Sequence, residues 1–342
     1  FMYELVEVLV NQMGSQFNEL KSQKDLIQKV VKEEEESFLR TLEDGLKRIE
    51  QITKNAKGEI AGKQIFELYD TYGFPADLTS LILAEQNLSF NKTDFDKAMQ
   101  EQKDRSKKSG KIEKGDWEVL SNDEVEEFVG YTFLETKVKI TRYRKVKTND
   151  GQQYQLVFNL TPFYPEGGGQ VGDKGVIESQ IETIAIVDTK KENNLIVHLI
   201  DELPKDVNAN FMAKVDASNR KASERNHTAT HLLQESLIMV LGEHVVQKGS
   251  LVNPNYLRFD FTHFSKIEKS DLHKIELDVN AKILANISLN EYVDLPLSKA
   301  EGMGAIMLFG EKYEDVVRMI QFDSSKELCG GTHVKATGEI GL

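Results

Sequence analysis

The sequence predicts an α+β multidomain protein, with a helical N-terminal domain, a small antiparallel β-barrel and a second domain that mixes helices and strands. Three patterns predict this order. Apolar residues recur every three or four positions up to about residue 116, which is typical of helices. From Trp117 onwards they alternate with polar residues in short segments, and a helical segment reappears near residue 220. We therefore expect domains over residues 1–115, 116–217 and 218–342.

The N-terminal domain is expected to open with two helices. Residues 1–13 place apolar side chains on one face, and Gly14 follows as a stop signal. A much longer helix is expected from about Asn18 to Ala56, with Gly58 as its end. Its apolar stripe consists of Leu26, Ile27, Val30, Val31, Phe38, Leu42, Leu46, Ile49 and Ile52.

Three shorter helices are expected to complete this domain. A helix over residues 63–72 is ended by the Gly-Phe-Pro sequence that follows it. Asp77 is placed to cap a second helix, because its side chain can accept from free amides of the first turn. Thr93 and Asp96 resemble a capping box for a third helix. The polar, glycine-containing residues 106–115 then predict a linker.

The alternating segments that follow predict the barrel. Residues 137–147 alternate as a half-buried strand does, and the Asn-Asp-Gly at 149–151 predicts a turn into the next strand. Short alternating segments separated by turns are typical of small antiparallel structures. We therefore expect a barrel over residues 133–215. Its further strands are expected at residues 154–160, 183–188, 195–200 and 210–215.

The last domain is expected to be built around a helix from Ser223 to Leu241. Helical and alternating segments are mixed after it, which favours an α+β arrangement. A second helix is expected at residues 270–284. The strands are expected near residues 249–252, 257–261, 287–293 and 316–322.

Two short motifs that lie far apart carry the strongest chemical signal. The first, from His227 to His231, lies on the predicted helix, where residues four apart share a face. The second, from Cys329 to His333, contains a Gly-Gly pair that permits a tight turn. Their three imidazoles and the only thiol of the chain form a set that tetrahedral Zn²⁺ accepts. A shared zinc ion would join two remote elements and define a pocket between them.

Each half of this set also has a simpler interpretation. A pair of His residues on a helix is often accidental, and a single Cys often behaves as a small buried hydrophobe. The combination favours zinc, because it uses the sole Cys and three of the seven His residues. A metalloprotease helix would carry Glu as general base directly after the first His. Thr228 occupies that position, which argues against a peptidase.

Composition limits the classes of protein that fit. No apolar run is long enough to span a membrane, and no signal peptide is visible. A single Cys excludes an intramolecular disulfide and suits a reducing, cytoplasmic location. The net charge of −13 argues against indiscriminate binding of nucleic acid but leaves room for local basic tracks. Because the chain begins with Phe1 rather than Met, we interpret it as a piece of a longer protein.

Three further segments combine glycine with large or polar residues. Residues 161–173 contain three consecutive glycines, which favour close approach of the backbone to a ligand or to another strand, although an ordinary loop is the alternative. Residues 247–250 follow the His helix closely and are expected to face the metal pocket. Residues 302–313 are expected to form either plain core with a turn or a loop that closes the pocket.

Together these segments resemble the alanyl-tRNA synthetase family. The strings HTATHLLQ, QKGSLV, LRFDF, LFGEKY and CGGTHV, in this order, are similar to its zinc-binding α+β editing domain, and TPFYPEGGGQVGD resembles the barrel that precedes this domain. LYDTYGFPADLT and the long helix before it resemble the tRNA-recognition region, which the free-standing alanyl-tRNA editing proteins lack. The resemblance implies that the class II aminoacylation core lies before Phe1 and that the oligomerising part lies beyond Leu342.

The resemblance also implies roles for individual residues. It implies that the editing pocket is lined by Gln247 and that zinc is bound by His227, His231, Cys329 and His333. Asp70 and Asp77 fall in the region that reads the tRNA acceptor stem. An Asp can accept a hydrogen bond from a guanine amino group in the shallow minor groove of RNA, whereas the simpler role of Asp77 is the helix cap.

Positive charge for tRNA binding has several candidate sources on this acidic chain. Arg220 and Arg225 lie beside the metal helix, and residues 137–147 form a basic strand face. Any one such cluster is often only a solvated face. Further candidates are Lys103, Arg105, Lys107, Lys108, Lys111 and Lys221.

The chemistry expected of the family follows from the need to distinguish alanine from glycine and serine. A pocket for alanine rejects glycine only weakly, since one methyl group is worth about 1–3 kcal/mol, and it rejects serine weakly as well. A second site that hydrolyses the wrong ester at the tRNA 3′ end can demand a hydrogen bond to the serine hydroxyl. We expect hydrolysis of Ser-tRNA(Ala), and of Gly-tRNA(Ala). The candidates for hydroxyl recognition are Gln247, Thr228, Thr230 and Ser250.

The role of zinc is open at this stage. Four protein ligands would close the coordination shell and fix the pocket, whereas loss of one ligand would permit water activation. No carboxylate adjoins either motif as an obvious general base. Two other classes of protein also fit the motifs, namely a structural zinc module that binds RNA without hydrolysis, and a metal hydrolase of small esters or peptides.

Overall fold

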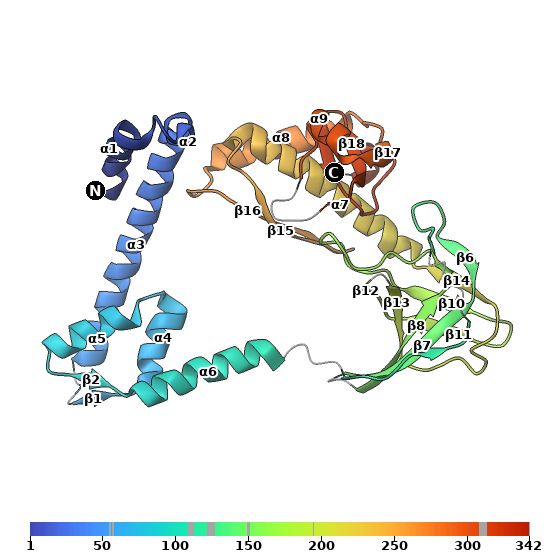
Figure 1. Ribbon diagram of the computed structural model, residues 1–342, viewed down its shortest axis with the longest axis horizontal. Helices are drawn as coiled ribbons and strands as arrows, with labels where there is room; N and C mark the ends of the chain where they lie inside the picture. The colour runs from blue at the N-terminus through green and yellow to red at the C-terminus, as the bar shows by residue number, and fades with distance from the viewer. Residues whose placement is uncertain are drawn as a thin grey trace. The chain divides into compact units, whose positions relative to one another are not determined.

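The computed structural model describes residues 1–54, 56, 58–108, 113–121, 127–148, 151–193, 195–307 and 313–341. The chain forms two compact units, Phe1–Lys111 and Ile112–Leu342 (Figure 1). The first is helical and the second contains several antiparallel sheets, so the predicted mixed α/β multidomain class is confirmed. The finer division at residues 115 and 217 stays a prediction.

The first unit packs its helices around one apolar core. Its central side chains are Ile49, Ile65, Leu68, Phe74 and Leu83. A short parallel pairing of β1 (Glu59–Ile60) with β2 (Ser89–Phe90) joins two connecting segments between the helices. The helices are α1 (Met2–Met13), α2 (Asn18–Ser22), α3 (Lys24–Thr53), α4 (Gly62–Tyr72), α5 (Ala76–Glu85) and α6 (Lys92–Lys108).

Three local expectations in this unit were wrong. The long helix is interrupted at Gln23, whose backbone leaves the helical region, so it begins as α2 and continues as α3. Asp77 is not the cap of α5, because Pro75 occupies the N-cap position and the Asp77 carboxylate accepts only from the amide of Leu78 inside the first turn. The start of α6 is capped by Asn91, whose side-chain oxygen accepts from the amide of Asp94 at 2.9 Å, rather than by a Thr93–Asp96 box.

The first half of the second unit consists of two antiparallel sheets. The smaller has the order β11-β10-β14-β6 and the larger has the order β12-β13-β8-β7-β3, with β4 also paired to β7. The smaller sheet comprises β6 (Glu135–Val138), β10 (Gly175–Glu178), β11 (Thr183–Ile186) and β14 (Phe211–Val215). The larger comprises β3 (Glu113–Lys114), β4 (Glu118–Val119), β7 (Ile140–Thr148), β8 (Gly151–Phe158), β12 (Asp188–Glu192) and β13 (Leu195–Ile200). A short parallel pair joins β5 (Glu127–Phe128) to β9 (Leu160–Thr161).

The expected barrel was wrong, since neither sheet closes on itself within the described residues. The chain leaves the smaller sheet at Val138 and enters the larger one at Ile140. Between them, the amide of Lys139 donates to the side-chain oxygen of Asn159 at 2.8 Å, so the strand expected over residues 137–147 is split between two sheets. One shared core joins the two sheets. It includes Val138, Leu156, Phe158, Ile177, Ile186, Ile200, Phe211 and Ala213.

The second half of this unit is built on α7 (Ala217–Leu241). The helix begins earlier than expected, because the Asp216 carboxylate accepts from the amides of Ser218 and Asn219 and caps it. A hairpin and a three-stranded sheet lie along the helix (Figure 1). The remaining elements are β15 (Gln247–Val252), β16 (Leu257–Phe261), α8 (Lys269–Leu284), β17 (Asn290–Pro296), α9 (Leu297–Gly302), β18 (Val316–Phe322), β19 (Ser325–Leu328) and a final turn of 3-10 helix (Thr337–Ile340).

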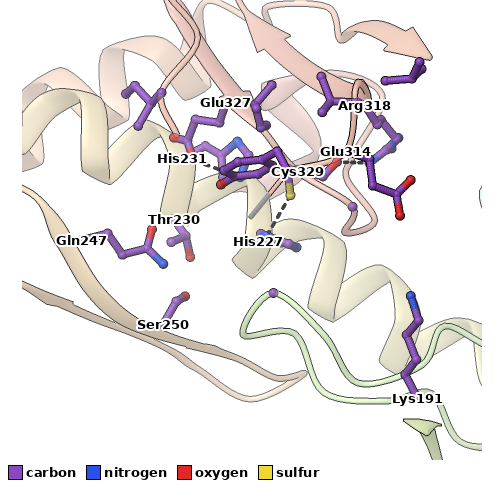
Figure 2. A pocket seen from close by; sticks show the side chains of 17 residues that line it. Lys191, His227, Thr230, His231, Gln247, Ser250, Glu314, Arg318, Glu327 and Cys329 are labelled. Atoms are coloured by element: carbon purple, nitrogen blue, oxygen red, sulfur yellow. Dashed lines mark hydrogen bonds and ion pairs between the residues drawn. The ribbon is translucent and has the colours of Figure 1, made fainter. Parts of the chain in front are cut away.

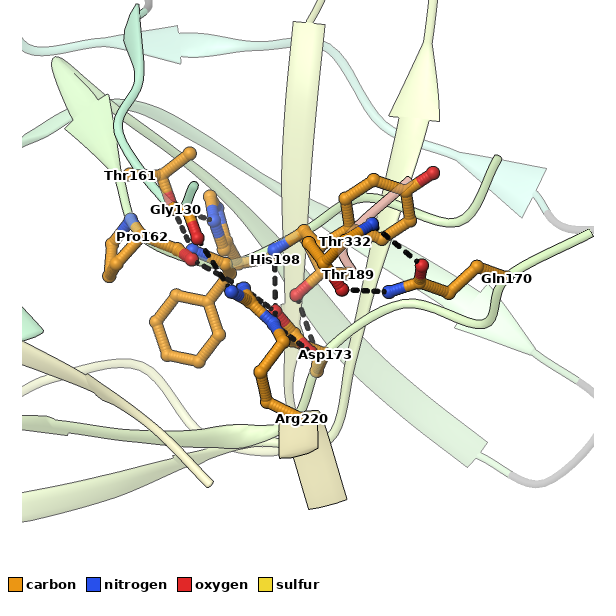
Figure 3. Close-up of polar contacts among 11 residues, drawn as sticks. Gly130, Thr161, Pro162, Gln170, Asp173, Thr189, His198, Arg220 and Thr332 are labelled. Carbon is orange, nitrogen blue, oxygen red and sulfur yellow. Dashed lines mark hydrogen bonds and ion pairs between the residues drawn. The ribbon is translucent and has the colours of Figure 1, made fainter. Parts of the chain in front are cut away.

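A buried arginine fastens α7 to the sheets (Figure 3). The Arg220 side chain is 1% exposed and is paired with the carboxylate of Asp173. It also donates to the carbonyls of Gly130 at 2.6 Å and Pro162 at 2.8 Å. A guanidinium held in this way is not available to a phosphate group, so the placement argues against the expected RNA contact for Arg220.

Candidate metal centre

The two remote motifs converge on one point in the second unit (Figure 2). His227 and His231 project from the same face of α7, and Cys329 and His333 lie on the turn that follows β19. One ligand atom from each residue can be chosen such that all four lie within 4.8 Å of one another. The Cys329 Sγ atom is 3.5 Å from Nε2 of His227 and 3.3 Å from Nε2 of His333. This is the spacing of donor atoms around a single small cation.

Glycine at position 331 lets the turn approach α7. A Cβ atom there would lie 2.0 Å from Cε1 of His227, which no packed structure permits. Among the described residues, no heavy atom other than those of its chain neighbours lies within 4 Å of the corresponding Cβ position of Gly330. The amide of Gly331 also donates to the Cys329 sulfur at 3.3 Å. Of the two glycines, only Gly331 is therefore required by close packing.

The outer nitrogens of two imidazoles are held by side chains that the sequence did not single out for this role. The Oε1 atom of Gln170 accepts from Nδ1 of His227 at 2.8 Å and from the amide of Thr332 at 3.0 Å. The hydroxyl of Thr228 is 3.1 Å from Nδ1 of His333 and accepts from the amide of Val334. Such partners fix the ring orientation and point Nε2 inward, as they do around metal ligands. This contact points to a positioning role for Thr228, in place of recognition of a substrate hydroxyl.

A buried carboxylate adjoins the cluster, contrary to the expectation that none would. The Oε2 atom of Glu327 lies 3.3 Å from Nε2 of His231, and burial raises the pKa of Glu327 to about 8. The signal in the sequence was its position only two residues before Cys329. Within the described residues, Nδ1 of His231 and Oε1 of Glu327 are buried without a hydrogen-bond partner.

The protonation states of the three imidazoles fit a metal ion. Burial lowers the pKa of His227 to about 4, and it lowers the pKa of His231 and His333 well below the usual value, so all three rings are neutral near pH 7. Neutral imidazole is the form that ligates a metal. Burial raises the pKa of the Cys329 thiol to about 12, and a coordinated cation would reverse this by stabilising the thiolate. The unpartnered nitrogen of His231 and the N₃S donor set are compatible with zinc.

A pocket of about 470 Å³ opens beside the cluster (Figure 2). Gln247, Ser250 and Thr230 line it. Gln247 and Ser250 are three residues apart and would lie on opposite faces of a regular strand. A β-bulge between Gln247 and Gly249 shifts the register of β15, which lets both side chains face the same space. Further lining residues that the sequence did not indicate are Lys191, Glu314, Val317, Arg318, Glu327 and Leu328.

The glycine-rich segment approaches β15, which is one of the two outcomes expected of it. Gly169 has a φ of +83°, and a Cβ atom there would lie 2.8 Å from the carbonyl oxygen of Ser250. The amide of Val252 donates to the Gly169 carbonyl at 2.7 Å, and the amide of Val171 donates back to the carbonyl of Val252. Gly168 lines the pocket. The glycines thus place one wall of the pocket and, through Gln170, hold a ring of the metal cluster.

The remaining residues that were expected to form the site or to bind tRNA lie in several different environments. Asp70, Asp77 and Arg225 are exposed, and Asp70 accepts from the side chain of Gln102. Ile306 and Tyr313 line the pocket, while the residues between 308 and 312 lie outside the described ones. The side chains of the basic track over residues 103–111 also lie outside them. Among the described residues, no helix is both long and apolar enough to cross a bilayer.

Comparison with known proteins gives two family matches. Residues 1–219 match the model of the class II tRNA synthetases (A), and residues 317–342 match the second additional domain of threonyl and alanyl tRNA synthetases. The second match contains Cys329 and His333, but the first ends before the His pair of α7.

Curated relatives of the chain carry the name alanine–tRNA ligase. The protein of Bacteroides fragilis is 54% identical over 100% of the chain, that of Flavobacterium psychrophilum is 52% identical over 99%, and that of Porphyromonas gingivalis is 48% identical over 100%. The chain spans only about 40% of the length of these relatives.

Proposed function

The chain belongs to the class II (A) tRNA synthetases, and from this premise we propose that it is the part of an alanine–tRNA ligase that binds tRNA(Ala) and hydrolyses its mischarged esters. The substrates are Ser-tRNA(Ala) and Gly-tRNA(Ala), and the products are the free amino acid and tRNA(Ala). The observation that carries the proposal is the convergence of four metal-binding side chains beside a pocket of about 470 Å³. A pocket of this size suits an aminoacylated ribose.

Recognition of serine falls to the polar side chains of the pocket that remain available. The hydroxyl of Thr230 donates to the carbonyl of Asn226 at 2.9 Å, so its oxygen offers only lone pairs to a ligand. An acceptor fixed in this way suits the hydroxyl proton of a seryl group, and Gln247 and Ser250 face it across the pocket. Alanyl and glycyl esters have no hydroxyl and would leave these groups unpaired, which disfavours the alanyl ester and makes the glycyl ester the weaker of the two proposed substrates.

The metal centre supports this pocket from one side. His227, His231, Cys329 and His333 would hold a zinc ion, which when bound places a positive charge near the ester and the terminal ribose. Because four protein ligands fill a tetrahedral shell, we assign the centre mainly to shaping the pocket. Glu327 lines the pocket next to His231, and because burial raises its pKa to about 8, only its ionised form, which increases with pH, could take a proton from an attacking water molecule.

The tRNA partner is proposed to engage both units. Asp70 and Asp77 are exposed and available to the acceptor stem, and Arg225 is exposed on the helix that carries the His pair. Phosphate contacts by Arg225 and other exposed cations would make tRNA affinity fall with salt. Cytoplasmic location follows from this partner and stays part of the proposal.

The deciding experiment uses mischarged tRNA. Ser-tRNA(Ala), Ala-tRNA(Ala) and a small seryl ester are incubated separately with the chain, with the chelated chain, and with the chelated chain after addition of Zn²⁺. We expect rapid loss of serine only from Ser-tRNA(Ala), loss of this activity on chelation and its return with zinc.

Other outcomes identify the alternative functions. Binding of zinc and tRNA without loss of serine would show a structural RNA-binding module and would overturn the proposal. Hydrolysis of the small ester as fast as of Ser-tRNA(Ala) would show a general esterase.

A further inference from the structure

Two side chains that do not belong to the metal cluster donate hydrogen bonds to the turn that carries Cys329. We propose that Arg318 and Tyr131 form a carbonyl clamp that positions the Cys329 thiol and sets how tightly the chain holds its metal ion. The inference rests on the proposed zinc centre and adds to it two positioning residues that neither motif contains.

The clamp engages three successive carbonyl groups. Nη1 of Arg318 donates to the carbonyl of Cys329 at 2.8 Å and to that of Gly331 at 2.7 Å. The hydroxyl of Tyr131 donates to the carbonyl between them, that of Gly330, at 2.7 Å. Every peptide carbonyl from the thiol to the residue before Thr332 therefore has a side-chain donor.

The two clamp residues are fixed in turn. Nε of Arg318 donates to the carboxylate of Glu291 on β17 at 2.7 Å, and the Arg318 side chain is only 12% exposed. Its guanidinium carbon lies 4.1 Å from the centre of the Tyr131 ring, a stacking that suits the flat cation. The amide of Cys329 donates to the carbonyl of Arg318, so Arg318 holds the start of the turn by its backbone as well.

The turn needs such support because its own sequence does little to restrict the conformation of the backbone. Two adjacent glycines leave the backbone more conformations than other residues would. The sulfur must nevertheless stay within reach of three rings, and the amide of Gly331 must stay directed at it. Fixing the carbonyls on both sides of these groups removes that freedom. Outer residues that orient metal ligands commonly change affinity by about 10–100-fold when they are lost.

The test compares conservative variants with matched controls. Arg318→Lys keeps the charge but loses the planar guanidinium, whose Nη1 serves both carbonyls while its Nε is held by Glu291, and Tyr131→Phe keeps the ring but loses the hydroxyl. The controls are Arg258→Lys and Tyr256→Phe, which change exposed side chains of the hairpin region away from the turn. The rate of zinc release to a chromogenic chelator and the thiolate-to-metal absorption of the Co²⁺-loaded protein are measured, with circular dichroism as the check on folding.

We expect zinc release to be about 10–100-fold faster in Arg318→Lys and up to about tenfold faster in Tyr131→Phe, with a weakened or shifted thiolate band in both. The controls should match the wild type. Wild-type release rates and an unchanged band in both folded clamp variants would overturn the inference. So would a rise in KM for Ser-tRNA(Ala) without any change in metal release, since that result would make Arg318 a substrate contact. If the wild-type chain itself takes up no zinc or cobalt, the proposed metal centre fails first, and this outcome is distinguishable from failure of the clamp.

Discussion

Two helices of similar length show different uses of the same periodicity. Helix α3 has 30 residues, of which only Gly45 and Ile49 are buried, and three side chains of its apolar stripe are exposed, including Phe38 at 52%. Helix α7 has 25 residues and buries many polar side chains, including Arg220 and both His residues of the cluster. An apolar stripe identifies a helix but not its role. Buried polar groups need hydrogen-bond or metal partners, so they mark the positions of a helix that have a specific structural or chemical role.

The largest expected effect tests whether the buried polar residues of α7 are needed for stability. Arg220→Met removes one partner of a buried ion pair and leaves Asp173 and two carbonyls uncompensated. We expect a loss of about 3–5 kcal/mol in the free energy of unfolding, measured with urea. Arg225→Met, on an exposed position of the same helix, should change it by less than about 0.5 kcal/mol. Equal effects of the two variants would show that burial does not set the importance of polar residues in α7.

The next-largest effect distinguishes Gly331 from its neighbour Gly330 in the turn that carries Cys329. Gly331→Ala would force a methyl group into His227, whereas Gly330→Ala meets no neighbouring atom. We expect Gly331→Ala to slow hydrolysis of Ser-tRNA(Ala) by more than about 100-fold, because a displacement of about 1 Å at a catalytic site can have this cost. Gly330→Ala should stay within a few-fold of the wild type. Similar rates for both variants would place the turn farther from α7 than the structure does.

A pH effect is expected from a buried ring that lies outside the metal cluster. Burial lowers the pKa of His198 to about 3, and its two nitrogens contact Thr161 and the carbonyl of Leu156. Because the folded-state pKa lies below the unfolded value of about 6.5, its contribution is fully present above pH 6.5 and is lost as pH falls towards 3. Stability should fall by up to about 1.4 kcal/mol per pH unit from this group.

His198→Gln provides the comparison, since it can keep hydrogen bonds but cannot take up the proton. The variant should show a flatter profile of unfolding free energy between pH 6.5 and 3 than the wild type. Parallel profiles would mean that His198 titrates normally and is reached by water.

The smallest effect is expected at Leu39, an exposed apolar residue of α3 that lies outside its apolar stripe. Leu39 is 55% exposed, so Leu39→Ser removes little buried area. The free energy of unfolding should change by no more than about 0.5 kcal/mol. A loss of several kcal/mol would show that Leu39 is covered in solution, and analytical ultracentrifugation would then reveal whether a second copy covers it.

Much of the site followed from residue types and spacing, and the rest depended on contacts that no local pattern encodes. The His pair on one helix face and the Cys turn were predictable, because helix geometry and a Gly-Gly pair act within a few residues. The α3 break at Gln23 and the split at Lys139 were not, since each depends on where neighbouring segments pack.

The supporting residues show the same limit. Gln170 and Tyr131 reach the metal turn across 162 and 199 positions of sequence, respectively. Arg220 looked like a surface cation because its partner Asp173 lies 47 positions away. Glu327 alone could have been found locally, because it lies on β19 only two residues before Cys329.

X-ray absorption at the zinc edge tests the central claim most directly, because it reports which atoms surround the ion. The chain should bind one zinc ion with one sulfur at about 2.3 Å and three nitrogens at about 2.0–2.1 Å, and Cys329→Ala should lose the sulfur contribution. A shell without sulfur in the wild type, or a chain that retains no zinc, would contradict the convergence of the two motifs on a single ion.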